Sequence, residues 1–163
     1  MENDSKDSKK AEMCRPKLDT DKIFSDIQIQ IIKRECHKIR SLMETASKEQ
    51  IVNGYLSGFP AGRCGLTCRV LGPWLIGLFP NYDYEYVCGF HGRQSHAWIE
   101  MNNLIIDITA DQFDNISEPV IVTYDHSFHD TFMAKTYRKM SIEDMSQYPE
   151  SKIFKFLQEN NYP

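Results

Sequence analysis

The chain has 163 residues, of which 41% are hydrophobic and 26% are charged, with a formal net charge of −4 at pH 7. This length favours one domain, which would bury about two thirds of its unfolded surface and need no disulfide or metal to fold. The small negative charge excludes a general attraction to nucleic-acid phosphates. No apolar run reaches the roughly 18 residues that a membrane-spanning helix requires.

The first part of the chain differs in composition from the rest. Residues 1–18 are polar and lack apolar periodicity, so we expect a disordered tail followed by a single domain over residues 19–163. The start of the chain does not have the apolar core of a secretory signal. Five cysteines at irregular spacing favour reduced thiols over a disulfide framework. We therefore expect a cytoplasmic protein.

Apolar residues predict two helices in the first half of the domain. They recur at three- and four-residue spacing from Ile23 to Met43, which predicts an amphipathic helix capped by Thr20 or Asp21. A short helical piece and a glycine- and proline-rich loop follow over residues 50–62. A second helix is predicted from Cys64, bent or tightened where Pro73 removes a backbone donor.

The second half of the domain has the two-residue period of strands. Strands are predicted at residues 82–90, 95–101, 104–109 and 119–124, and a short helix at Pro149. Helices first and an antiparallel meander afterwards predict an α+β fold, with the N-terminal helices packed on the sheet.

The segment from Gln94 to Thr109 predicts a catalytic pair. If Asn102 and Asn103 form a tight turn, His96 faces Thr109 across the hairpin and Asp107 faces Trp98. His96 and Asp107 then share a face as diagonal neighbours, with roughly 7 to 8 Å between their backbones on the two strands. The carboxylate would fix the tautomer of the imidazole and stabilise its protonated form.

A plainer interpretation is that His96 is a core histidine with one satisfied hydrogen bond. Asp107 weighs against it, because this carboxylate lies in the apolar stretch LIIDITA and an unpaired charge there would be costly to bury. We therefore expect Asp107 to have a dedicated partner.

Cys64 is the candidate nucleophile. It stands where a glycine-rich loop becomes a helix, and free N–H groups with the positive end of the helix dipole lower the pKa of a thiol placed there. Gly62 and Gly65 leave room for a substrate backbone. The sequence favours structural roles for three other thiols: Cys68 as a small buried side chain, Cys88 in a sheet and Cys36 in a helix.

Taken together, GRCGLTCRVLGPWL and YVCGFHGRQSHAWIEMNNLIIDITADQF resemble the catalytic core of the transglutaminase-like cysteine peptidases, a branch of the papain-like superfamily. The resemblance covers roughly residues 60–113. It implies a papain-like core with Cys64 as nucleophile, His96 as general base and acid, and Asp107 as the orienting carboxylate. The implied activity is that of a thiol-dependent hydrolase or acyl transferase on an amide or peptide bond, through a thioester. No cofactor or metal is implied.

Two positions of the candidate site have alternatives. The chain has Asp107-Ile108-Thr109 where the family often shows Asp-Pro-Thr, and Asp111 is the second candidate for the orienting carboxylate. The backbone N–H of Cys64 and one further group would bind the oxyanion, and Gln94 is a candidate for that group. The expected partner is a peptide, protein or small amide substrate, with no nucleic acid and no membrane; the oligomeric state stays open.

Other functions are possible for the same residues. A structural zinc site could use Cys64, Cys68, Cys88 and His91. His126 and His129 suggest a second metal site, although a solvated loop accounts for them more simply. A third possibility is a catalytically silent module that keeps a papain-like shape and only binds its partner.

Overall fold

The structure, a computed structural model, describes residues 24–161. These residues form three α-helices and one five-stranded antiparallel sheet of order β4-β3-β2-β1-β5. The helices are α1 (Asp26–Lys48), α2 (Cys64–Leu78) and α3 (Glu150–Asn160), and the strands are β1 (Tyr84–His91), β2 (Gln94–Met101), β3 (Leu104–Asp107), β4 (Ile121–Thr123) and β5 (Met133–Lys139). The predicted α+β class is confirmed, whereas the tail predicted over residues 1–18 lies outside the described residues.

Helix α1 begins later than predicted. Ser25 caps it through a reciprocal pair with Gln28, in which the hydroxyl of Ser25 accepts from the Gln28 N–H and the Gln28 side chain accepts from the Ser25 N–H. The predicted cap at Thr20 or Asp21 was therefore wrong, because the polar pair that satisfies the first free N–H groups lies one turn further along the chain.

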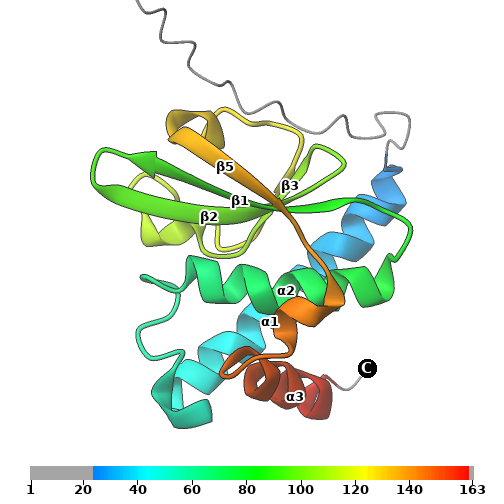
Figure 1. Cartoon of the computed structure of the whole chain (residues 1–163), viewed down its shortest axis with the longest axis vertical. Helices are drawn as coiled ribbons and strands as arrows, with labels where there is room; N and C mark the ends of the chain where they lie inside the picture. Colours follow the sequence, from blue (N-terminus) through cyan, green and yellow to red (C-terminus); the bar gives the residue numbers. More distant parts are fainter. Residues whose placement is uncertain (1–23, 162–163) are drawn as a thin grey trace, which may run out of the picture.

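The three helices lie on one side of the sheet, with α2 nearest to β1 and β2 (Figure 1). Most of the core lies between these two layers and includes Ile32, Ile39 and Met43 of α1, Val70, Leu71 and Leu75 of α2, and Ile99, Leu104 and Ile106 of the sheet. A smaller apolar cluster covers the opposite face of the sheet and contains Val87, Trp98, Ile105 and Phe132. The sheet is thus buried on both faces around the hairpin β2–β3.

The segment before α2 carries the chain to Cys64 through consecutive turns. Their backbone hydrogen bonds include Ala61 N–H to Gly58 O at 3.0 Å and Arg63 N–H to Pro60 O at 3.1 Å. Gly62 has a φ of 65°, a left-handed conformation that favours glycine. The predicted glycine- and proline-rich loop is confirmed, and α2 begins at Cys64 as expected.

Strand β5 was not expected from the sequence. Most of its side chains are exposed, so its residues do not alternate between apolar and polar. It is held instead by backbone pairing along β1, where Glu85, Val87 and Cys88 face Lys139, Tyr137 and Thr136. An edge strand held in this way shows no alternation of apolar and polar residues in the sequence, so it could not be predicted.

Within residues 24–161, no helix is both long enough and apolar enough to span a bilayer.

Candidate active site

The turn at Asn102 and Asn103 fixes the register of the β2–β3 hairpin. Both residues have positive φ, 46° and 67°, as a tight two-residue hairpin turn requires. The pairs Met101–Leu104, Glu100–Ile105 and Ile99–Ile106 form as predicted. The described pairing stops there, so the expected pairs of His96 with Thr109 and of Asp107 with Trp98 are not part of the ladder.

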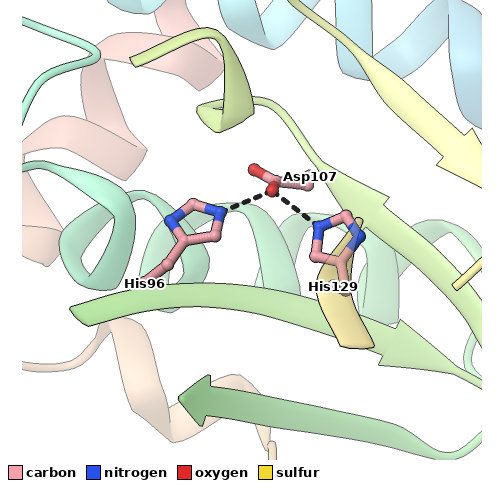
Figure 2. Close-up of side chains that lie close together, drawn as sticks. All are labelled: His96, Asp107 and His129. Atoms are coloured by element: carbon pink, nitrogen blue, oxygen red, sulfur yellow. Dashed lines mark hydrogen bonds and ion pairs between the residues drawn. The ribbon is translucent and has the colours of Figure 1, made fainter. Parts of the chain in front are cut away.

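Asp107 ends β3 and joins two histidines (Figure 2). Its Oδ2 accepts a hydrogen bond from Nε2 of His96 at 2.6 Å and another from Nε2 of His129 at 2.9 Å. Its Oδ1 accepts from the backbone N–H and the hydroxyl of Thr109, at 2.9 and 3.1 Å. Since a carboxylate can only accept, both Nε2 atoms carry protons and each histidine keeps Nδ1 for other partners.

These contacts set the charge states of Asp107 and His96. Burial raises the pKa of Asp107, but the charge of His96 and the hydrogen bonds from His129 and His96 hold that pKa well below its usual range. Burial lowers the pKa of His96, while the charge and hydrogen bond of Asp107 and the contact with Cys64 raise it to about 9. At neutral pH the pair is therefore an imidazolium and a carboxylate.

His129 is a site residue whose role sequence reasoning missed. Its side chain is 1% exposed and lies in the short turn η3 (His129–Thr131), so the interpretation of this histidine as part of a solvated loop was wrong. His126, in contrast, donates from Nε2 to the carbonyl of Asn103 at 2.8 Å. The available signal was the apolar pair Phe128 and Phe132 around His129, which indicates a segment packed on the sheet.

Aromatic rings close the site on the face of the sheet opposite the helices. The ring of His96 lies 5.0 Å from Phe113 and 5.3 Å from Phe132, measured between centroids. His129 lies 4.8 Å from Trp98 and 4.9 Å from Phe128. Hydrogen bonds to Asp107 are strong in this environment, because the rings exclude water and lower the local dielectric.

Cys64 approaches the same pair from the start of α2. Burial raises the pKa of this thiol, but a side-chain hydrogen bond with His96, the charge of His96 and backbone hydrogen bonds from Ala97 and Gly65 together lower it below its ordinary value. Nε2 of His96 is directed at Asp107, so Nδ1 is the ring nitrogen available to the sulfur. The pairing of β2 with β3 has ended before Ala97, which leaves this edge of β2 open to the helix terminus.

The other described cysteines have different environments. Burial raises the pKa of Cys68 and of Cys36 well above the ordinary thiol value, and both side chains are buried. Cys88 is half-buried in β1, and burial raises its pKa as well. Among the described thiols, Cys64 is the one whose pKa is lowered, so its environment is the one that favours a reactive thiolate.

The two alternatives raised from the sequence have different surroundings. Asp111 forms a two-pronged ion pair with Arg40, at 2.7 and 2.8 Å, and this pairing directs its carboxylate to α1. Gln94 is exposed at the start of β2.

Gln112, which was not a candidate from the sequence, lies against His96. Its Nε2 is 3.4 Å from Nδ1 of His96 and donates to the carbonyl of Thr109 at 2.8 Å. Its Oε1 accepts from the N–H of Gly62 at 3.2 Å. The side chain of Gln112 thus links the loop before Cys64 to the turn after Asp107.

Among residues 24–161, one group of side chains could hold a metal ion. The ligand atoms of His96, Asp107 and His129 lie within 4.8 Å of one another, and all three residues are buried. A cation at this position would have to displace the protons that both Nε2 atoms share with Asp107.

The zinc ligands considered from the sequence do not form such a group within residues 24–161. His91 is exposed and directs Nδ1 to the carbonyl of Thr131 at 3.2 Å. Cys68 is buried within the helix-side core whereas His91 lies on the surface, so these four possible ligands do not converge.

In comparisons with known proteins, no family model, curated protein or solved structure matches the chain. Its function therefore has to be inferred from its own residues.

Proposed function

We propose that the protein is a thiol-dependent hydrolase or acyl transferase that acts on an amide or peptide bond through Cys64, His96 and Asp107. The observation that carries the proposal is the continuous chain of contacts from the Cys64 thiol to His96 and on to Asp107. A lowered thiol pKa and a raised imidazole pKa are the pattern of an activated nucleophile with its base. A papain-like core of the transglutaminase-like type is part of the same proposal, supported by a nucleophile at a helix start and a base on an antiparallel strand.

The reaction would proceed in two halves. The Cys64 thiolate attacks the carbonyl carbon of the substrate, and the C–N bond breaks as His96 transfers its proton to the leaving nitrogen. This leaves an acyl group on sulfur as a thioester. A water molecule or an amine then attacks the thioester, His96 takes the proton of that nucleophile, and Cys64 leaves as a thiolate. Asp107 keeps its charge throughout and stabilises the imidazolium.

Stabilisation of the oxyanion would come from donors around Cys64. Its own backbone N–H lies in the first turn of α2, where backbone donors have no partner inside the helix. The Nε2 group of Gln112 lies against His96 and is a better placed second donor than Gln94. Two such donors aimed at the developing charge are the usual requirement for acyl transfer.

His129 acts as a positioning residue in this scheme. It contacts Asp107 and not the sulfur, and it fixes the carboxylate by a hydrogen bond to the oxygen that also accepts from His96. Its Nδ1 is buried and has no hydrogen-bond partner among the described residues. The proton that His129 donates to Asp107 therefore lies on Nε2.

Labelling with iodoacetamide at pH 7 tests the nucleophile. We expect Cys64 to react first, no fast labelling in Cys64→Ser, and labelling at least about tenfold slower in His96→Ala, because the thiol pKa rises when the imidazolium is removed. Cys68→Ser is the matched control and should keep the fast reaction. Equal labelling of all five cysteines, read by peptide mass mapping, would count against the proposal.

Acylation separates an enzyme from a silent module with the same shape. Incubation with 4-nitrophenyl acetate should add one acetyl group to Cys64, detected by intact mass and lost with time. Faster loss on addition of methylamine would indicate an acyl transferase, and an unchanged rate a hydrolase. A protein that reacts with iodoacetamide but never loses the acetyl group would be a binding module.

A metal site at His96, Asp107 and His129 is the second candidate function, favoured by the closeness of their ligand atoms. Dialysis against a chelator distinguishes the two. If the protein is the proposed thiol-dependent enzyme, iodoacetamide labelling of Cys64 is unchanged after dialysis. Metal analysis of the undialysed protein then finds less than one metal ion per chain. Loss of a stoichiometric metal together with unfolding would favour the metal site.

A further inference from the structure

A cavity of about 560 Å³ opens where the chain enters α2. Its lining includes Gly62, Arg63 and Gly65, which are the chain neighbours of Cys64, together with Arg69 one turn further along α2. Residues on both sides of Cys64 in the sequence line this space although Cys64 itself does not, so an acyl group on the sulfur would have to extend past the start of α2 to enter it. The two glycines add no side chains to its wall where the chain enters α2.

The charged side chains that line this cavity are all positive. Two arginines line it, and no aspartate or glutamate does. The charge of Arg69 is already matched, since its Nε donates to Glu150 at 2.6 Å. Arg63 therefore supplies the unmatched positive charge.

Arg63 has a buried N–H group, on Nε, that donates to no acceptor among the described residues. Its Nε is buried without a hydrogen-bond partner among residues 24–161, and its Nη1 makes one long contact, 3.4 Å, to the carbonyl of Gly62. Within the same residues it forms no ion pair with a carboxylate. A guanidinium N–H that is buried and unpaired costs free energy, which an anion in the cavity would offset.

A second cavity, of about 390 Å³, lies beside the aromatic rings of Phe113 and Phe132 that contact His96. Its lining also includes Gln94, Gln112 and Asp114, and the amide of Gln112 contacts the ring of His96. The hydrogen bond from Gly62 to Gln112 joins the rims of the two cavities. The leaving amine takes its proton from His96, so this second space is suited to the amine side of the substrate.

We propose that the cavity beside Cys64 binds the acyl portion of the substrate and that Arg63 recognises a carboxylate carried by that portion. The inference rests on the proposed function, because it takes Cys64 to be the acylated residue. A planar guanidinium can bind a carboxylate through two parallel hydrogen bonds, which a lysine cannot reproduce. The substrate class is thus an amide whose acyl side is acidic.

Matched alkylating reagents test this inference directly on the intact chain. The first pair is iodoacetate, which carries a carboxylate, and iodoacetamide, which is neutral. The second pair is longer and consists of the anionic 3-maleimidopropionate and the neutral N-ethylmaleimide. We expect Arg63→Gln to slow the reaction of Cys64 with at least one anionic reagent by about fivefold or more, since one opposite charge is lost near the reacting carbon. The neutral reagents should react within about twofold of the wild-type rate, which also reports that the site remains folded.

Arg34→Gln is the control for net charge. Arg34 lies on α1 with a side chain 66% exposed, so its loss should change none of the four rates. Anionic and neutral rates that fall equally in Arg63→Gln, or an anionic preference that is unchanged in this variant, would overturn the inference while leaving the nucleophile in place. Absence of fast labelling by all four reagents in the wild-type protein would instead overturn the proposed function.

Discussion

At the scale of single residues, Asp107 organises the candidate site. Four donors surround its carboxylate, two of them imidazole N–H groups. A carboxylate held in this way keeps its charge in a place that is 3% exposed, where an unpaired charge would be costly. The catalytic proposal therefore depends on His96 and His129 binding one oxygen together.

Replacement of His129 tests its positioning role. His129→Leu removes one donor to a buried carboxylate, so we expect the free energy of unfolding to fall by about 2 kcal/mol. The pKa of Asp107 should rise, which moves the acid limb of the pH profile for Cys64 labelling to higher pH. His129→Gln retains an N–H donor and should restore most of the wild-type profile. A Leu variant with reduced stability but an unchanged pH profile would assign His129 a purely structural role.

The dependence of stability on pH follows from the two shifted groups. The pKa of His96 is raised from 6.5 to about 9, so its stabilising contribution is complete below about pH 6.5 and is lost as the pH rises through 9. The pKa of Asp107 is lowered from 3.8, so its contribution is present above that value and is lost in acid. Urea unfolding should show the highest stability between about pH 4 and 6.5, with a fall in stability on the acid side and on the alkaline side. Both falls should be smaller in Asp107→Asn, whereas the exposed Asp114→Asn should keep them.

At the scale of elements, the β2–β3 hairpin determines which side chains can meet. Its two-residue turn places even-numbered residues of β2 and odd-numbered residues of β3 on one face. A shift of one residue would direct Asp107 to the helix side and separate it from His96. The turn is therefore as important to the site as the side chains themselves.

Asn103 is the position at which the turn can be tested. Its φ is 67°, and an alanine there would be strained by about 1 kcal/mol. We expect Asn103→Ala to lower the free energy of unfolding by about this amount and Asn103→Gly to leave it unchanged or higher. If urea unfolding gave equal stabilities for the two variants, backbone strain would not be what selects this residue.

At the scale of the whole molecule, an ion pair ties the first helix to the segment beyond the hairpin. The side chain of Arg40 is 7% exposed and donates to both oxygens of Asp111 and to the carbonyl of Ile108. Gln112 follows Asp111 directly, so this contact also holds the residue that lies against His96.

Loss of this ion pair should lower both the stability of the protein and the reactivity of Cys64. We expect Arg40→Met to lower the free energy of unfolding by about 2 to 4 kcal/mol, because it leaves a partly buried carboxylate unpaired, and to slow labelling of Cys64. Lys155→Met breaks the exposed pair with Glu159 and should cost less than about 0.5 kcal/mol. Equal effects of the two substitutions in urea unfolding would contradict the structural account.

The sequence alone determined the hairpin, the contact between His96 and Asp107 and the start of α2 at Cys64. These features depend on periods of two and of three to four residues and on a tight turn, which are local properties of the chain. The tertiary structure decided the rest: the edge strand β5, the place of His129 on Asp107, the pairing of Asp111 with Arg40 and the proximity of Gln112 to His96. Such contacts join segments that no local period relates, and burial and charge pairing select them only once the chain has packed.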